Sequence, residues 1–406
     1  MQNNQLLPET IPSLNGLTYM FDFKNVRCVL IDQFVRADGS NYDGTSSYAN
    51  NAVDQVEWVD TVLSSNATDR HAFVFAHKNL IGQNHKDNLF GNALSNNPEA
   101  RDYFLKSLYN NGVRYYLSGH DHMHHYSKVT SGDGSASVGQ IICSSNSYKF
   151  YIPREGDDGR EIPYDQELFT IGYYIFTIDG PRVTVDFYSS SHGFDYADVR
   201  LSAPPAAFYF YLRDTFGYSL NGNDFEVARG ESYTKVSDSY HNTTVRILAG
   251  ANGNTETDYI GRELSKFVTT GWTESDSVDG AVSHILSLWG MADNLSLYNE
   301  ELEGALPEEN ESQECDIFTL SMTCEALKDS SGKNHKKFCL ATKHESGWVN
   351  AVDMNFEGGK KFVRGPWRPE YELGTWGIDK HSVWAVINHD GEFAVMPIAA
   401  VENQNS

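Results

Sequence analysis

The chain of 406 residues is long enough for two or three domains, each with its own apolar core. Its net charge of −24 argues against nucleic acid or an anionic membrane as the main partner, because phosphate groups are bound by basic surfaces. No apolar run is long enough to span a bilayer, and the first residues have neither the basic segment nor the apolar core of a signal peptide.

The first predicted elements are a hairpin and a helix. Two apolar runs separated by a turn indicate the hairpin over residues 17–32. A loop rich in Gly, Ser, Asn and Asp follows at residues 38–50 and could line a substrate cleft. Residues 51–64 then place four apolar side chains on one helical stripe, which we predict to pack on the core: Val53, Val56, Val59 and Leu63.

Two further predicted strands each end just before a histidine. The apolar run 72–76 is followed at once by His77. The run 113–117 leads into Gly119-His120-Asp121-His122. The carboxyl ends of neighbouring parallel strands meet at one edge of a sheet, where ligands of open α/β sheets bind. Neutral imidazole is the commonest transition-metal ligand in proteins, so the sequence predicts a metal site there.

The segment between these histidines is expected to be a loop followed by a helix. Residues 78–96 are polar and contain glycine, as an active-site loop would. Asn97-Pro98 is a strong helix start, with an N-cap residue before a proline at the first helical position. We expect four residues on the buried face of this helix: Ala100, Phe104, Leu105 and Leu108.

The spacing of His120 and His122 favours two metal ions over one. In an extended segment, His120 and His122 would leave the backbone at two separate points, with Asp121 between them on the other face. We therefore expect the two imidazoles to reach different ions, with Asp121 only spacing them. His124 and His125 extend the cluster but begin the next strand, so we do not expect them to be ligands.

The two histidine blocks resemble the last two motif blocks of the calcineurin-like metallophosphoesterases. These blocks are Phe75-Ala76-His77-Lys78-Asn79 and Leu117-Ser118-Gly119-His120-Asp121-His122, and the resemblance extends over residues 17–195. Ala76 and Asn79 stand where the family usually has Gly and Pro. The resemblance implies an αββα sandwich, with two sheets between outer helices, and it implies that His77 and His120 bind one metal and His122 the other.

The first three motif blocks of that family are not found in this chain. Five short segments imitate them and are rejected, because none restores the family's order: Asp69-Arg70-His71, Gly132-Asp133, Gly156-Asp157, Asn84-His85 and Asn388-His389-Asp390. We therefore interpret the sequence as an N-terminally incomplete phosphoesterase domain, or as one half of a split enzyme whose missing motifs lie on another polypeptide.

The resemblance also implies an activity and a location. The activity is hydrolysis of a phosphate ester by two divalent or trivalent transition metals, with Fe, Mn and Zn not distinguished, which polarise the phosphate and acidify a water. The location is extracellular or periplasmic. Two close dications repel each other and need compensating carboxylate or hydroxide, which three neutral imidazoles do not supply. We expect the isolated chain to bind one metal weakly and to hydrolyse phosphoesters slowly or not at all. The sequence does not identify catalytic residues.

The second half of the chain is predicted to be β-rich. After a composition change near Ala203-Pro204-Pro205, we divide the chain into a phosphoesterase part at 1–202, a β-leaning region at 203–305, a linker at 306–314 and a β-rich domain at 315–406. A helix is expected around residues 259–268. Asp390-Gly391 between two apolar runs predicts a hairpin.

The β-rich tail, which resembles modules of some bacterial secreted phosphoesterases, raises an alternative function. Four of its tryptophans could contact a carbohydrate or another surface, or could pack a small β-sandwich: Trp348, Trp367, Trp376 and Trp384. In the first case the chain would be a non-catalytic binding module that carries a relic metal site.

The five cysteines show no C-x-x-C spacing. Cys28 and Cys143 fall within apolar runs, where we expect them in the core. The other three, Cys315, Cys324 and Cys339, allow for one disulfide, which would indicate an oxidising compartment.

Overall fold

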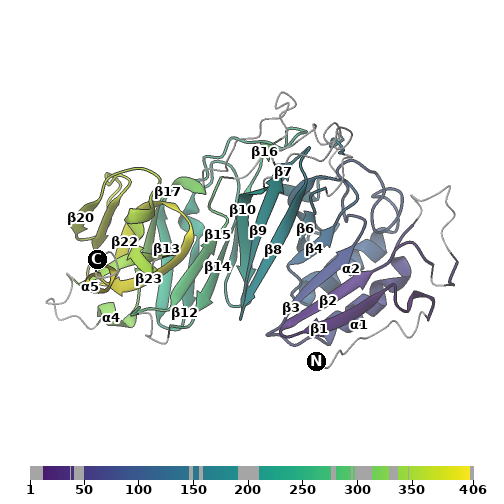
Figure 1. The fold of residues 1–406 in the computed structure, drawn as a ribbon, viewed down its shortest axis with the longest axis horizontal. Helices are drawn as coiled ribbons and strands as arrows, with labels where there is room; N and C mark the ends of the chain where they lie inside the picture. Colours follow the sequence, from purple (N-terminus) through teal and green to yellow (C-terminus); the bar gives the residue numbers. More distant parts are fainter. Residues whose placement is uncertain are drawn as a thin grey trace, which may run out of the picture.

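The computed structural model describes residues 12–36, 38–40, 50–145, 150–154, 159–190, 210–275, 280–293, 296–297, 313–328, 337–345 and 347–402. The chain is a mixed α/β protein in which strands make up 47% and helices only 13%. Figure 1 shows helices α1 and α2 at one end, then a large sheet, a small sheet and finally two further sheets.

The large sheet has eight strands in the order β1-β2-β3-β4-β6-β5-β7-β16. Its central strands β2, β3, β4 and β6 are parallel, and the others add antiparallel neighbours except β16, which runs parallel to β7. The strands are β1 (Tyr19–Phe23), β2 (Val26–Ile31), β3 (His71–Ala76), β4 (Tyr115–Ser118), β5 (His124–Thr130), β6 (Ser137–Ile142), β7 (Glu161–Glu167) and β16 (Ser296–Leu297). The predicted hairpin, strands and connecting order are confirmed here.

Helices α1 (Val56–Ser64) and α2 (Pro98–Asn110) cover one face of this sheet. Their apolar stripes form one core with the sheet, to which Val59, Leu63, Phe104 and Leu105 contribute. The predicted helices are therefore confirmed, although α1 begins as a 3₁₀ turn at Val53–Gln55. The predicted N-cap Asn97 has a left-handed backbone, with φ of 46°, and its side chain donates to the Phe90 carbonyl instead of capping the helix.

A three-stranded sheet, β10-β9-β8, packs on the opposite face of the large sheet. It consists of β8 (Gly172–Asp179), β9 (Arg182–Ser190) and β10 (Phe210–Ser219). A core of aromatic and branched side chains joins the two sheets, among them Phe73, Tyr115, Val185 and Phe216. The described residues of this part therefore form three layers: the two helices, the large sheet and the three-stranded sheet. The outer helix layer that an αββα sandwich needs over the second sheet is not found in this part of the chain, where β10 instead faces β14 and β15.

The remaining strands form two six-stranded sheets around the largest core. One sheet is β11-β14-β15-β23-β18-β19 and the other is β12-β13-β17-β22-β21-β20. Their bounds are β11 (Asp224–Val227), β12 (Ser237–Tyr240), β13 (Thr243–Ala249), β14 (Lys266–Thr273), β15 (Ile285–Trp289), β17 (Glu314–Thr323), β18 (Phe338–His344), β19 (Gly347–Asn350), β20 (Lys361–Arg364), β21 (Thr375–Ile378), β22 (Val383–His389) and β23 (Gly391–Pro397). Short helices α4 (Glu325–Lys328) and α5 (Ile398–Glu402) lie at the ends of strands.

The strand pairing does not follow the predicted division of the chain. β10 lies beyond residue 202 but belongs to the small sheet with β8 and β9. The regions 203–305 and 315–406 contribute strands to the same two sheets, so they form one unit. The boundary at Ala203-Pro204-Pro205 and most of the linker at 306–314 lie outside the described residues.

Two local predictions in this half are wrong. Residues 259–260 form a turn, residues 261–265 are not helical, and β14 begins at Lys266, so no helix covers 259–268. The Asp390-Gly391 turn does not close a hairpin, because β22 pairs with β17 and β21 whereas β23 pairs with β15 and β18. The chain crosses from one sheet to the other at Asp390.

Most of the tryptophans considered for surface binding are buried. Trp348, Trp376 and Trp384 are 3%, 8% and 1% exposed. Trp348 and Trp376 belong to the core between the two sheets, whereas Trp384 stacks on Tyr371 and donates to the Gly365 carbonyl. Trp367 alone of the four is partly exposed. The carbohydrate-binding alternative thereby loses three of its four candidate side chains.

None of the five cysteines, all within described segments, is in a disulfide bond, so the hint of an oxidising compartment has no structural counterpart. Cys28 and Cys143 line the core between the two sheets, as expected. In the described parts of the chain, no helix is both long and apolar enough to span a bilayer.

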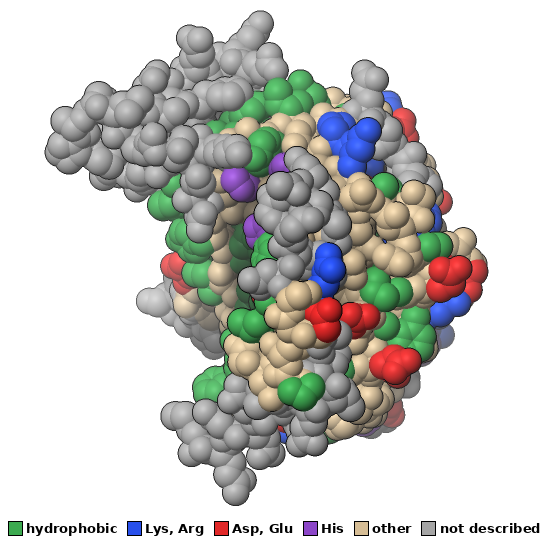
Figure 2. Space-filling model, turned by 90° about the vertical axis from the view of Figure 1, so that its right-hand side faces the viewer, with side chains coloured by type: hydrophobic (Ala, Val, Ile, Leu, Met, Phe, Trp, Pro, Cys, Tyr) green, Lys and Arg blue, Asp and Glu red, His purple; other side chains and the backbone are tan. Residues whose placement is uncertain are grey.

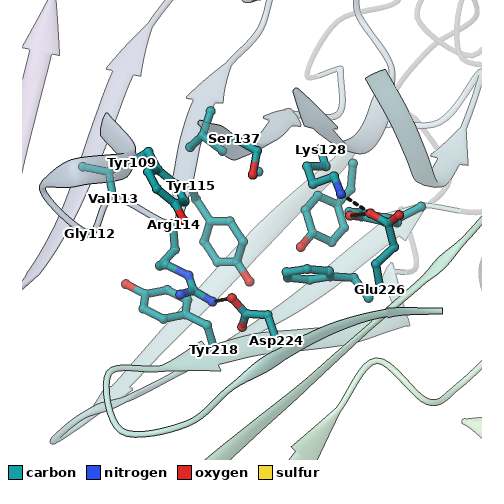
Figure 3. A pocket seen from close by; sticks show the side chains of 15 residues that line it. Tyr109, Gly112, Val113, Arg114, Tyr115, Lys128, Ser137, Tyr218, Asp224 and Glu226 are labelled. Carbon is teal, nitrogen blue, oxygen red and sulfur yellow. Dashed lines mark hydrogen bonds and ion pairs between the residues drawn. The ribbon is translucent and has the colours of Figure 1, made fainter. Parts of the chain in front are cut away.

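The junction between the two halves of the molecule contains a partly open cavity of about 280 Å³. Figure 3 shows Arg114 pointing to Asp224 and Lys128 pointing to Glu226 across it, both as ion pairs between the large sheet and the edge strand β11. Tyrosine rings, including Tyr115 and Tyr218, line the space between the two pairs. This cavity lies at the amino end of β4, opposite the end that carries His120.

Candidate functional site

The candidate site lies where the parallel strands β3 and β4 end. Phe75 pairs with Leu117 in the register of these strands, and the Gly119 amide donates to the His77 carbonyl at 3.0 Å. His77 and the Gly119-His120 pair are therefore neighbours at one sheet edge, as the strand-end argument predicts. Figure 2 shows histidine side chains close together on this face of the molecule, next to hydrophobic side chains.

The two nearest imidazoles face each other through ring nitrogens. His120 Nδ1 lies 3.2 Å from His77 Nε2. Nitrogens that share a tetrahedral zinc ion at about 2.0–2.1 Å lie about 3.4 Å from each other, so this separation suits two ligands of one ion. Without a cation, the same distance corresponds to an N–H donated from one ring to the other.

The other nitrogen of His120 is held by a carboxylate. His120 Nε2 lies 3.2 Å from an oxygen of Asp87, whose second contact is the Lys78 ammonium at 2.9 Å. Burial acts to raise the pKa of Asp87, but the bonds from His120 and Lys78 outweigh it and lower that pKa to about 2. An ionised Asp87 accepts the Nε2 proton, which leaves the lone pair of neutral His120 on Nδ1, facing His77. Carboxylates orient metal-binding histidines in this way.

His77 is more open to solvent than His120 and His122. Burial, followed by the neighbouring imidazoles of His120 and His122, lowers the pKa of His77 below its ordinary value. A neutral imidazole keeps a lone pair for a cation, since metal ligands must be deprotonated. The phenyl ring of Phe34 lies beside it, with ring centres 5.9 Å apart.

The backbone that carries the Gly-His-Asp-His block is bent, which corrects the expectation of an extended segment. β4 ends at Ser118, and His120 and His122 have left-handed φ angles of 71° and 51°. A left-handed conformation costs a non-glycine residue roughly 1–2 kcal/mol. Two such residues separated by one position are held only if the surrounding structure fixes the segment between them.

Asp121 provides that fixation, so it does more than space the histidines. Its carboxylate is fully buried and accepts from the Asn79 amide side chain, from the backbone N–H groups of Gln83 and His85, and from His85 Nδ1. Bonds to a carboxylate contribute more than neutral ones, about 1.5–3 kcal/mol each against about 1. Together they tie the loop 77–91 to the strained histidine block.

His85 joins the site, although its Asn84-His85 segment was rejected on motif order. His85 Nδ1 lies 2.6 Å from Asp121, and the His85 ring stands 4.2 Å from that of His120, centre to centre. It also contacts Tyr151, as does His122. Asp87 and His85 are thus the residues missed from the sequence. The predicted active-site loop is polar at every position from Gln83 to Asn88, so its sequence does not single them out.

The other histidines considered serve the fold. His124 and His125 are fully buried in β5, where His124 bonds Tyr174 and His125 bonds Glu161. His71, from a rejected segment, bonds the Tyr218 hydroxyl and the Gly180 carbonyl.

Across the described residues, no group of three or more His, Cys, Asp or Glu side chains is arranged to hold a metal ion. The arrangement offers two imidazole nitrogens at one point, His77 Nε2 and His120 Nδ1, with His122 nearby. A complete site needs further ligands at that point.

No family model and no curated protein matches this sequence. The solved structures that share part of the chain path include these two. One is a purple acid phosphatase isolated from yellow lupin (Lupinus luteus) seeds, at 12% identity and a TM-score of 0.32, covering 50% of this chain and 32% of that one. The other is GAP50, the anchor in the inner membrane complex of Plasmodium, at 16% identity and a TM-score of 0.26, covering 46% and 48%. The chain thus spans about a third and about a half of these proteins, and similarity at this level does not assign it to a family.

Proposed function

We propose that this chain carries part of the two-metal site of a phosphoesterase, with His77 and His120 as ligands of one transition metal and His122 directed to a second. The observation that carries the proposal is the pair of imidazole nitrogens 3.2 Å apart at adjacent strand ends, one ring of which is held by Asp87. The chemistry follows from the motif resemblance: a divalent or trivalent metal at this place supplies Lewis acidity toward a phosphoryl oxygen. The chain's own residues hold and orient the imidazoles.

The donor set explains why we expect weak activity from the chain alone. Asp87 is a carboxylate beside His120, but it is engaged by His120 Nε2 and by Lys78. Two imidazoles bind one dication, whereas a second dication a few ångströms away requires negative charge between the two. We therefore expect one weakly bound metal per chain and slow turnover, unless another segment or polypeptide supplies further ligands.

The edge of the small sheet offers a place for such a polypeptide. β8 ends the order β10-β9-β8, and its outward Tyr173 and Ile175 are 44% and 45% exposed. An edge strand with exposed apolar side chains pairs readily with an added strand. A location outside the cytoplasm remains part of this proposal.

Metal content and hydrolysis test the proposal together. Elemental analysis of protein expressed in mixed-metal medium should find about one transition metal per chain and none in the H77A/H120A variant. Turnover of a chromogenic phosphate ester should be slow and should depend on added metal. Equal metal content in the variant would refute the histidine site. Fast turnover that is abolished by H120A and by H122A would show that the metal site of the isolated chain is complete.

A further inference from the structure

One arginine of the second half of the chain, Arg262, reaches the loop of the candidate site. Arg262 lies between β13 and β14, in the β-rich unit, and its guanidinium contacts Asp258, Glu161 and Gln83. Nε pairs with Asp258 at 2.6 Å, Nη1 pairs with Glu161 of β7 at 2.6 Å, and Nη2 donates to the Gln83 side chain at 2.9 Å. Glu161 and Gln83 are 101 and 179 positions away in the sequence. We call Arg262, Glu161 and Gln83 the arginine bridge.

Gln83 connects this bridge to the histidine block. Its side-chain Nε2 donates to both Glu161 oxygens, at 3.0 and 2.9 Å, and its side-chain oxygen Oε1 accepts from Arg262. Its backbone N–H donates to Asp121. Gln83 is therefore held from both ends, and it is one of the residues that keep Asp121 in place between the two strained histidines.

Arg262 is also a cationic partner of Glu161. The Glu161 carboxylate is 1% exposed and accepts from His125, Ser127 and Gln83 besides Arg262. The Gln166 side-chain oxygen accepts from the Tyr259 amide, so its nitrogen donates to His125 Nδ1. His125 thus offers Nε2 to Glu161, and Arg262 adds a full positive charge beside the same carboxylate.

From these contacts we propose that Arg262 is a positioning residue for the histidine site, through which the β-rich unit fixes the loop 77–91. The loop carries His77, His85 and Asp87, so its position sets how these side chains meet His120. The inference rests on the proposed function only for what the histidines do; the positioning itself is a property of the loop. It gives the region 203–305 a role that its sequence does not reveal.

Arg262→Ala leaves the buried Glu161 carboxylate without its arginine partner, and breaking such a pair destabilises the fold strongly. Arg262→Lys is the better variant. Its ammonium can pair with Glu161 but cannot also reach Gln83 and Asp258 in a fork, because lysine presents a single point charge. The matched control is Arg229→Lys, in an exposed pair with Glu263 of the same unit.

Local amide exchange in the metal-free protein is the first readout. In R262K we expect the Gln83 and His85 amides, both bonded to Asp121, to exchange at least about ten-fold faster than in wild type, with β2 and β4 unchanged. The nitrogen NMR signals of His85 should move from a fixed Nδ1–H tautomer toward an average of both tautomers. R229K should match wild type in both. Unchanged exchange and tautomer in R262K, or a uniform change across the whole fold, would overturn the positioning role.

Cobalt binding separates this inference from the proposed function. If both hold, R262K should bind Co²⁺ about ten-fold or more weakly than wild type, as for other losses of outer support. If wild type binds no Co²⁺ but R262K still frees the loop, the positioning role stands and the metal site fails. If wild type binds Co²⁺ and R262K binds it equally with an unchanged loop, the metal site stands and the positioning role fails.

Discussion

Replacing Asp87 by Asn tests how the site holds His120. Asp87 and Lys78 are both 2% exposed, and removing one partner of a buried ion pair costs about 3–5 kcal/mol. Part of this loss depends on pH. The pKa of Asp87 is lowered from 3.8 to about 2 in the folded protein, so the carboxylate contributes stability above pH 4 that is lost as pH falls through 2. At about 1.4 kcal/mol per pKa unit, its full contribution is about 2.5 kcal/mol, of which about 1 is gone at pH 3.

Urea unfolding of wild type and D87N at pH 7 and pH 3 measures both quantities. We expect D87N to be less stable by about 3–5 kcal/mol at pH 7, and this difference to shrink by about 1 kcal/mol at pH 3. An equal difference at both pH values would refute the assignment of an ionised Asp87 in the folded protein.

The double variant K78M/D87N separates stability from orientation. It removes both charges from the buried pair, so we expect most of the stability lost in D87N to return. His120 still lacks its carboxylate, and its affinity for Co²⁺ should stay about 10–100-fold below that of wild type. Wild-type affinity in the double variant would show that Asp87 does not orient His120 for a metal.

Three other predictions follow from buried groups and a crowded glycine. Burial lowers the pKa of His124 to about 3, so its neutral ring contributes stability that is lost as pH falls from about 6.5 toward 3. His124→Gln should therefore reduce the slope of the unfolding free energy against pH, between pH 6 and 4, by up to about 1.4 kcal/mol per pH unit. Burial raises the pKa of Asp390 to about 7, so the stability that the protonated carboxyl contributes below pH 4 is lost as pH rises to 7. Asp390→Asn should therefore stabilise the protein at pH 8 by at most about 4 kcal/mol, and by less because Asp390 is partly exposed. The same unfolding assay should show no gain at pH 4. A Cβ at Gly82 would lie 2.4 Å from the His85 carbonyl oxygen, so Gly82→Ala should cost about 1–3 kcal/mol and speed exchange of the His85 amide, whereas Gly359→Ala, in open space, should do neither.

The part of the site that sequence predicts is the part fixed by regular structure. The apolar runs before His77 and His120 form strands because branched and aromatic side chains pack on both faces of a buried sheet. One helix, α2, joins the two strands, and a single helical crossover makes them parallel neighbours. Their carboxyl ends must then meet, which brings the two histidines together without any knowledge of the loop.

The backbone of the histidine block could not be predicted in the same way. An alternating Gly-His-Asp-His sequence is compatible with an extended strand, and nothing in its composition demands left-handed angles at His120 and His122. Those angles depend on the buried Asp121, whose partners come from the loop 77–91. A loop without periodicity gives no indication of which of its polar side chains point inward, so His85 and Asp87 were missed.

The corner at Asp390 shows the same limit in the β-rich unit. Asp-Gly supplies a positive φ, here 130° at Gly391, that a tight hairpin and a sheet-to-sheet corner can both use. Alternation normally distinguishes them, but every residue of β22 is buried, so the strand has no solvent face to fix its partner. Contacts distant in sequence decide between the two, because β22 pairs with β17 and β23 pairs with β15. Arg262 belongs to the same class of residue: three carboxylate or amide partners decide its role, and two of them lie more than 100 positions away.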